Sequence, residues 1–82
     1  MRTLFAGHSA HWGQILSYYV LVEDLGEREK SYGVEVRLKE ECCRLMDLTS
    51  HRGRIETLME ALIRHDVTPV ALRDVVEDWL LL

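Results

Sequence analysis

The chain has 82 residues, of which 48% are hydrophobic and 29% charged, so we expect one folded domain with a small core. Its formal net charge is −4, and neither half has the excess of Lys and Arg that binding to nucleic acid requires. No apolar run approaches the roughly 18 residues that span a bilayer, and the chain start is unlike a signal peptide, so we expect a cytoplasmic protein without membrane contact.

Residues 1–13 carry apolar side chains without a period, which predicts an irregular N-terminal arm ahead of a single domain over residues 14–82. His8 and His11 have the spacing of a metal-binding pair on a helix. No second pair and no nearby carboxylate completes such a site. We therefore expect two exposed histidines and no metal or other cofactor.

Residues 14–23 are rich in β-branched and aromatic side chains, which predicts a strand. Both of its faces are apolar: the first carries Leu16, Tyr18, Val20 and Val22, and the second carries Ile15, Tyr19 and Leu21. Such a strand needs cover on both sides. Either Leu4, Phe5 and Trp12 fold back over the second face of a monomer, or another protein subunit covers it.

A polar loop over residues 24–30 predicts a hairpin to a second strand over residues 31–39. This strand alternates strictly, so one face should be apolar and the other should lie in water. The apolar face consists of Tyr32, Val34, Val36 and Leu38, and the polar face of Gly33, Glu35, Arg37 and Lys39.

Residues 42–48 predict a third strand whose phase stays open. Its inward residues are either Cys43 and Leu45, or Cys42, Met46 and Leu48. Arg44 lies on the second of these faces and favours the first, and a bulge near Asp47 would reconcile the two. Adjacent cysteines in a strand point to opposite faces, so we expect two reduced thiols, as in a reducing compartment.

Residues 49–82 predict two amphipathic helices. Thr49 or Ser50 can cap the first, from Arg52 to about His65, and Thr68 followed by Pro69 can cap the second. Their apolar stripes are Ile55, Leu58, Met59, Leu62 and Ile63 in the first helix, and Leu72, Val75, Val76, Trp79 and Leu80 in the second. The order β-β-β-α-α predicts a two-layer α+β domain in which both helices cover a three-stranded antiparallel sheet.

Three segments resemble a known family: DLTS from Asp47, the string VTPVALRDVVEDWL from Val67, and YGVEV from Tyr32. The family comprises short uncharacterised bacterial proteins of unknown function, typical of spore-forming Gram-positive anaerobes. The resemblance covers roughly residues 18–82 and implies a compact domain of three strands and two helices. It implies no activity.

Two clusters of charged residues are candidate sites. Ser50, His51, Arg52 and Arg54 surround the start of the first predicted helix, where basic side chains oppose the helix dipole unless an anion is bound. We therefore consider a weak anion site there, against the alternative of arginines lying in solvent. On the second helix, Asp74, Glu77 and Asp78 form an acidic face. A face that simply lies in water is a simpler explanation for these carboxylates than a metal site or a docking surface for a partner.

No nucleophile motif or cofactor motif is present, so we expect no catalytic residues and no enzyme activity. The expected function is that of a small protein-interaction or regulatory module, with a homodimer as its form. Its candidate interface consists of Trp12, Ile15, Tyr19 and Leu21. The alternative is an anion-binding or small-ligand-binding domain that uses the start of the first helix.

Overall fold

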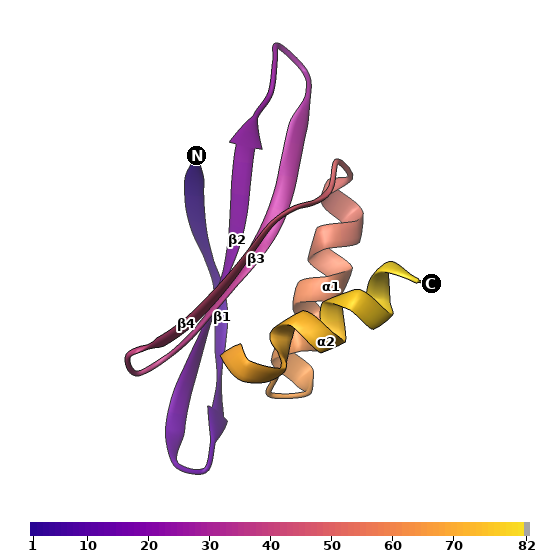
Figure 1. Ribbon diagram of the computed structural model, residues 1–82. Coiled ribbons are helices and arrows are strands. Elements are labelled where there is room, and N and C mark those ends of the chain that lie inside the picture. The colour runs from indigo at the N-terminus through magenta and orange to yellow at the C-terminus, as the bar shows by residue number, and fades with distance from the viewer. Residues whose placement is uncertain (82) are drawn as a thin grey trace.

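The computed structural model describes residues 1–81. Four strands precede two helices, namely β1 (Arg2–His11), β2 (Gln14–Asp24), β3 (Lys30–Leu38), β4 (Glu41–Thr49), α1 (Arg52–Arg64) and α2 (Pro69–Leu80). The strands form one antiparallel sheet in the order β1-β2-β3-β4, and both helices pack on the same face of it (Figure 1). The α+β prediction is confirmed, but the sheet has four strands and not three.

The additional strand is β1, so the expectation of an irregular arm over residues 1–13 was wrong. A bulge between Phe5 and Gly7 shifts the register against β2, which breaks the alternation that would reveal a strand. The turn into β2 has positive φ at both Trp12 (52°) and Gly13 (75°), as a two-residue hairpin of type I′ requires. Tryptophan is an unusual residue in that conformation, which hides the turn from sequence inspection.

The core lies between the helices and one face of the sheet. Leu80, the last residue of the second predicted stripe, is 47% exposed. The core contains most of the other apolar residues predicted for this face of β2 and β3 and for the two helical stripes, and its fully buried members are Leu16, Tyr18, Val34, Val36, Ile55, Leu58, Leu62, Leu72 and Val76. Because each of these residues follows its element's own period, the sequence sufficed to find them.

Strand β4 places Cys43 and Leu45 on the helix side, as favoured by the position of Arg44. A bulge then separates the pair Val34/Leu45 from the pair Tyr32/Thr49, and Asp47 within it has φ 56°. This bulge brings Leu48 onto the core as well. The predicted reconciliation near Asp47 is therefore confirmed. Cys42 and Cys43 are both free, the first exposed and the second half-buried.

The helix boundaries agree with the sequence, but one cap does not. His51 is the N-cap of α1 and makes no side-chain capping bond, while Thr49 Oγ1 accepts from the His51 backbone N–H (3.1 Å). Thr68 caps α2 by accepting from the Ala71 N–H, with Pro69 at the first helical position as predicted. Within residues 1–81, neither helix is both long and apolar enough to cross a membrane.

Tyr18 ties β1 and the α1–α2 connection to the core. Its side chain is fully buried, and its hydroxyl donates to the Val67 carbonyl (3.0 Å) and lies 3.2 Å from Ser9 Oγ. Tyr18→Phe should lower the free energy of unfolding by about 1 to 2 kcal/mol, because a buried carbonyl loses its donor. Urea denaturation measures this. Tyr32→Phe, which removes the hydroxyl of a half-buried tyrosine, is the control and should change stability less.

Burial also raises the pKa of Tyr18 above its ordinary value. The folded protein therefore holds this phenolic proton more tightly than the unfolded chain. Its contribution to stability is complete below the unfolded pKa of about 10 and is lost as pH rises through the folded pKa. The Tyr18→Phe variant should lose less stability than the parent between about pH 8 and about pH 11, and an equal loss would contradict this assignment.

Candidate functional site

The face of the sheet opposite the helices carries a buried charge. Glu35 on β3 is 0% exposed, whereas the alternation of that strand predicted a residue in water. Its carboxylate accepts from the Arg37 guanidinium, and the Nη2 of Arg44 on β4 lies 2.6 Å from Glu35 Oε1. Glu35 and Arg44 are direct cross-strand partners, which explains how β4 completes the pair.

Aromatic rings extend this cluster across the sheet to β1. The Arg37 guanidinium lies 4.3 Å from the centre of the Tyr19 ring, and the Phe5 and Tyr19 rings meet edge-on with their centres 5.6 Å apart. The hydrogen bond to Glu35 raises the pKa of Arg37 above its ordinary value. We call Phe5, Tyr19, Glu35, Arg37 and Arg44 the outer-face cluster. It joins all four strands and occupies much of the sheet face opposite the helices, which the sequence analysis left without intramolecular cover.

The four predicted interface residues, Trp12, Ile15, Tyr19 and Leu21, differ widely in their exposure to solvent. Leu21 is 1% exposed and is not available to a partner. It lies opposite Gly33, which the β4 backbone approaches so closely that a Cβ there would be 2.8 Å from Met46 Cα. Tyr19 is half-buried within the outer-face cluster, whereas Ile15 and Trp12 are 65% and 91% exposed near the β1–β2 turn. Of the four predicted interface residues, Ile15 and Trp12 are therefore the two whose side chains are mostly exposed.

The two edges of the sheet differ in character. Edge strand β4 carries Glu41, Arg44 and Asp47, and charged side chains protect an edge from pairing. Both edge strands contain a bulge, so the difference between them lies in their charge. Edge strand β1 has ten residues, and its only Lys, Arg, Asp or Glu is Arg2. Its Leu4 and Phe5 are 46% and 62% exposed. The sequence did not predict this edge because it did not predict the strand.

The candidate anion site at the start of α1 is largely engaged within the chain. Arg52 forms an ion pair with Glu56 at 2.9 Å, one turn further along the helix, and the Arg54 guanidinium lies 4.7 Å from the centre of the Trp79 ring on α2. Ser50 and His51 are exposed. The positive charge of Arg52 and Arg54, which suggested a bound anion, is thus partly balanced by the Glu56 carboxylate and by the face of the Trp79 ring.

The acidic face of α2 is solvated. Asp74, Glu77 and Asp78 are all exposed, and Asp78 contributes its backbone carbonyl to the end of the helix. Among residues 1–81, no three side chains of His, Cys, Asp or Glu are grouped to hold a metal ion.

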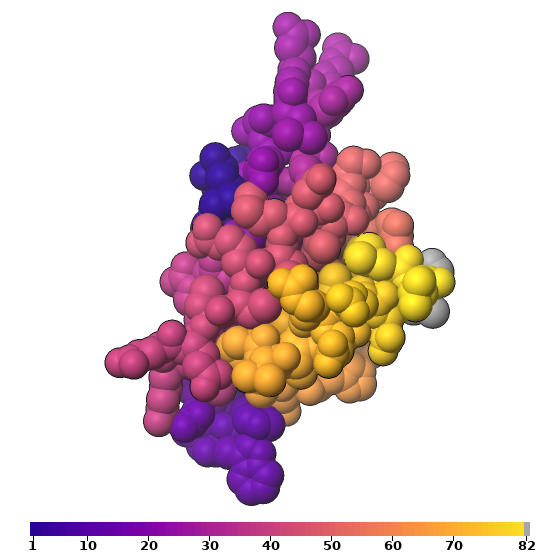
Figure 2. Space-filling model, in the orientation of Figure 1, coloured from indigo at the N-terminus to yellow at the C-terminus, as the bar shows by residue number. Residues whose placement is uncertain are grey.

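The molecule is elongated, with principal extents of 42 × 26 × 17 Å, because the sheet is longer than the helices that cover it. The β2–β3 turn and the β1–β2 turn project beyond the helix layer at opposite ends (Figure 2). An antiparallel four-stranded meander with two consecutive helices on one face defines a two-layer α+β domain.

A family of unknown function (DUF6514) matches residues 9–82, and the chain belongs to this family. The match begins inside β1, so residues 2–8 of that strand precede it. Comparison with curated proteins and with solved structures gives no match.

Proposed function

We propose that the protein is a small non-enzymatic interaction module that forms a homodimer by pairing the β1 strands of two copies. The observation that carries this proposal is the contrast between the two sheet edges. An exposed, uncharged edge strand presents a row of backbone N–H and C=O groups to another strand. In β1 this stretch runs from Thr3 to Ala10 without a Lys, Arg, Asp or Glu.

A second copy fits this edge better than an unrelated partner does. Antiparallel pairing about a twofold axis brings the same strand to itself, so an edge without fixed charge meets no like charge. The two sheets would join into one of eight strands, with the helices of both copies on the same side. Leu4 and Phe5 would then add apolar contacts to the new backbone hydrogen bonds.

The proposed interface therefore differs from the face of β2 that the sequence favoured. Phe5 and Arg37 already cover Tyr19, and Leu21 is buried, so little of that face needs a partner. We also propose the cytoplasm of a bacterium as the location. The free thiols of Cys42 and Cys43 support a reducing compartment, and the acidic net charge supports a partner other than nucleic acid.

Phe5→Lys tests the proposed dimer. A lysine in the middle of an edge strand opposes pairing, and the twofold axis places two of them in one interface, so dissociation should become at least about tenfold more favourable. Sedimentation equilibrium measures it, with circular dichroism to confirm that the variant is folded.

Val70→Lys is the matched control. Val70 is 82% exposed on α2, so the same gain of charge occurs away from β1 and should leave the dimer intact. A parent protein that stays monomeric at high micromolar concentration would rule the proposal out, as would equal dimerisation of the parent and Phe5→Lys.

A further inference from the structure

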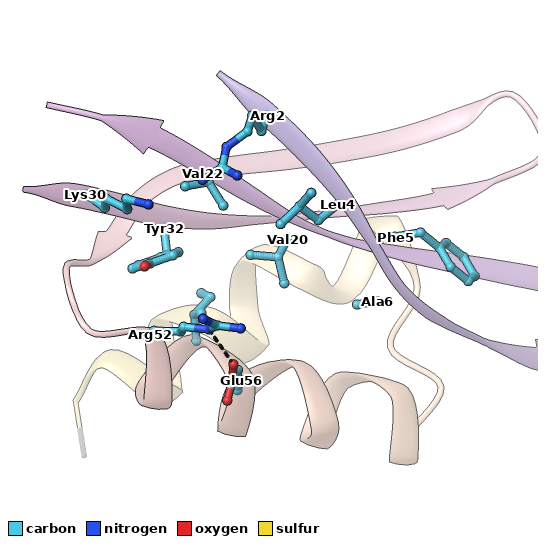
Figure 3. Close-up of a pocket in the computed structure, with 11 residues that line it drawn as sticks. Arg2, Leu4, Phe5, Ala6, Val20, Val22, Lys30, Tyr32, Arg52 and Glu56 are labelled. Carbon is cyan, nitrogen blue, oxygen red and sulfur yellow. Dashed lines mark hydrogen bonds and ion pairs between the residues drawn. The ribbon is translucent and has the colours of Figure 1, made fainter.

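A cleft of about 350 Å³ lies between the N-terminal half of β1 and the first turns of α1. Figure 3 shows Arg2 and Leu4 of β1 on one side of it, Val20 and Tyr32 behind, and Arg52 and Glu56 of α1 on the other side. This volume is within the range of small-molecule sites.

The closed end of the cleft lies where β1 comes close to α1 at Gly7. At Gly7 the backbone approaches the helix so closely that a Cβ would lie 3.0 Å from Ile63 Cδ1. Towards Arg2, the strand borders the cleft that separates it from the first turns of α1, where Arg52 and Ile55 form the opposite wall. Gly7 thus sets the closed end of a wedge.

The interior of the wedge is apolar. Val22 and Ile55 are 3% and 1% exposed and form its deepest part, and Val20, Leu4 and the Tyr32 ring are less buried. These side chains come from three strands and one helix, so their positions are fixed by the fold and not by a mobile loop.

The rim is basic in a chain of net charge −4. Arg2, Lys30 and Arg52 line the cleft, against one carboxylate, that of Glu56. Arg52 pairs with Glu56 across 2.9 Å, but both side chains are more than half exposed, and Lys30 reaches Asp24 only at 3.8 Å. Such exposed pairs are weak and exchange readily for a better anion. Arg2 forms no ion pair within residues 1–81.

We propose that this cleft binds a small amphipathic anion, with an apolar body over Val22 and Ile55 and a carboxylate or phosphate head held by Arg2, Lys30 and Arg52. Three basic side chains, from β1, β3 and α1, surround one apolar space. This combination of an apolar interior with a basic rim is what an amphipathic anion requires. The proposed site does not rest on the proposed dimer, although Leu4 and Phe5 border the cleft and would also contact the second copy.

Octanoate is the probe, observed by amide NMR. Octanol has the same apolar chain without the charge, and acetate has the charge without the chain. Octanoate should shift the signals of Val20, Tyr32 and Ile55 in a saturable way at millimolar concentration, and both controls should bind at least about tenfold more weakly. Unmoved signals with octanoate, or equal binding of octanol, would overturn the proposal.

Two variants distinguish the contacts to the charged head group from the contacts to the apolar chain. Combined Lys30→Gln and Arg52→Gln should weaken octanoate binding about tenfold or more, with little effect on octanol. Val20→Phe should fill the space and weaken both ligands. Arg73→Gln, an exposed arginine on α2 outside the cleft, is the control and should bind as the parent does. Octanoate binding that is unchanged in the double variant would contradict the assigned head-group site.

Discussion

Gly33→Ala should destabilise the protein by about 3 kcal/mol or more, the largest effect expected of any single methyl group added to this chain. The added Cβ would lie 2.3 Å from the Leu45 carbonyl oxygen and 2.8 Å from Met46 Cα. Both atoms belong to the backbone of the β4 bulge, so no side-chain rotation can relieve the overlap. Urea denaturation should show the loss as a lower midpoint.

The bulge cannot move away easily because Ser31 holds it. Ser31 is 4% exposed, and its hydroxyl donates to Asp47 Oδ1 at 2.7 Å. Gly26→Ala is the matched control, since a Cβ at that loop position meets nothing within 4 Å. It should leave stability within about 0.5 kcal/mol of the parent. Equal stability of the two variants would show that β4 does not cross Gly33 as described.

Glu35→Ala should lower the free energy of unfolding by about 2 to 3 kcal/mol, because it leaves two arginines without the carboxylate between them and opens a cavity beside Tyr19, its cross-strand neighbour. The expected loss is at the lower end for a broken buried pair, since the Arg37 and Arg44 side chains are 45% and 43% exposed and can regain water. Denaturant titration gives the value.

Two comparisons identify the cause of that loss. Glu56→Ala removes a carboxylate from an exposed ion pair and should cost less than about 1 kcal/mol. Combining Glu35→Leu with Arg44→Leu replaces charge by apolar contact and should recover at least half of the loss. If Glu35→Ala were no worse than Glu56→Ala, the outer-face cluster would contribute little to the fold.

The helices were predictable because their signals are local. The stripes from Ile55 to Ile63 and from Leu72 to Leu80 repeat at helical spacing, and Thr68 with Pro69 marks a start that the structure confirms. The cap of α1 was not predictable in the same way. Two adjacent hydroxyl residues, Thr49 and Ser50, both suit the role, and the structure instead has His51 as the N-cap.

The candidate site was harder to predict because its parts come from different strands. The sequence singled out the arginines at the start of α1. The other two basic residues that line the cleft with Arg52, namely Arg2 and Lys30, are distant from it in the chain. Likewise Glu35 looked like a solvent-facing residue of an alternating strand. Only its register against Arg44 and the position of Arg37 over Tyr19 make it a buried ion pair.

By itself, the sequence determined the α+β class, the core faces of β2 and β3 and the limits of both helices, and it favoured one of two phases for β4. These follow from periods of two and 3.6 residues within one element. The tertiary structure alone decided that residues 2–11 form a fourth strand, that Glu35 and Leu21 are buried, and which sheet edge is open. Those features depend on pairing between segments and on bulges that interrupt the period, so no single segment records them.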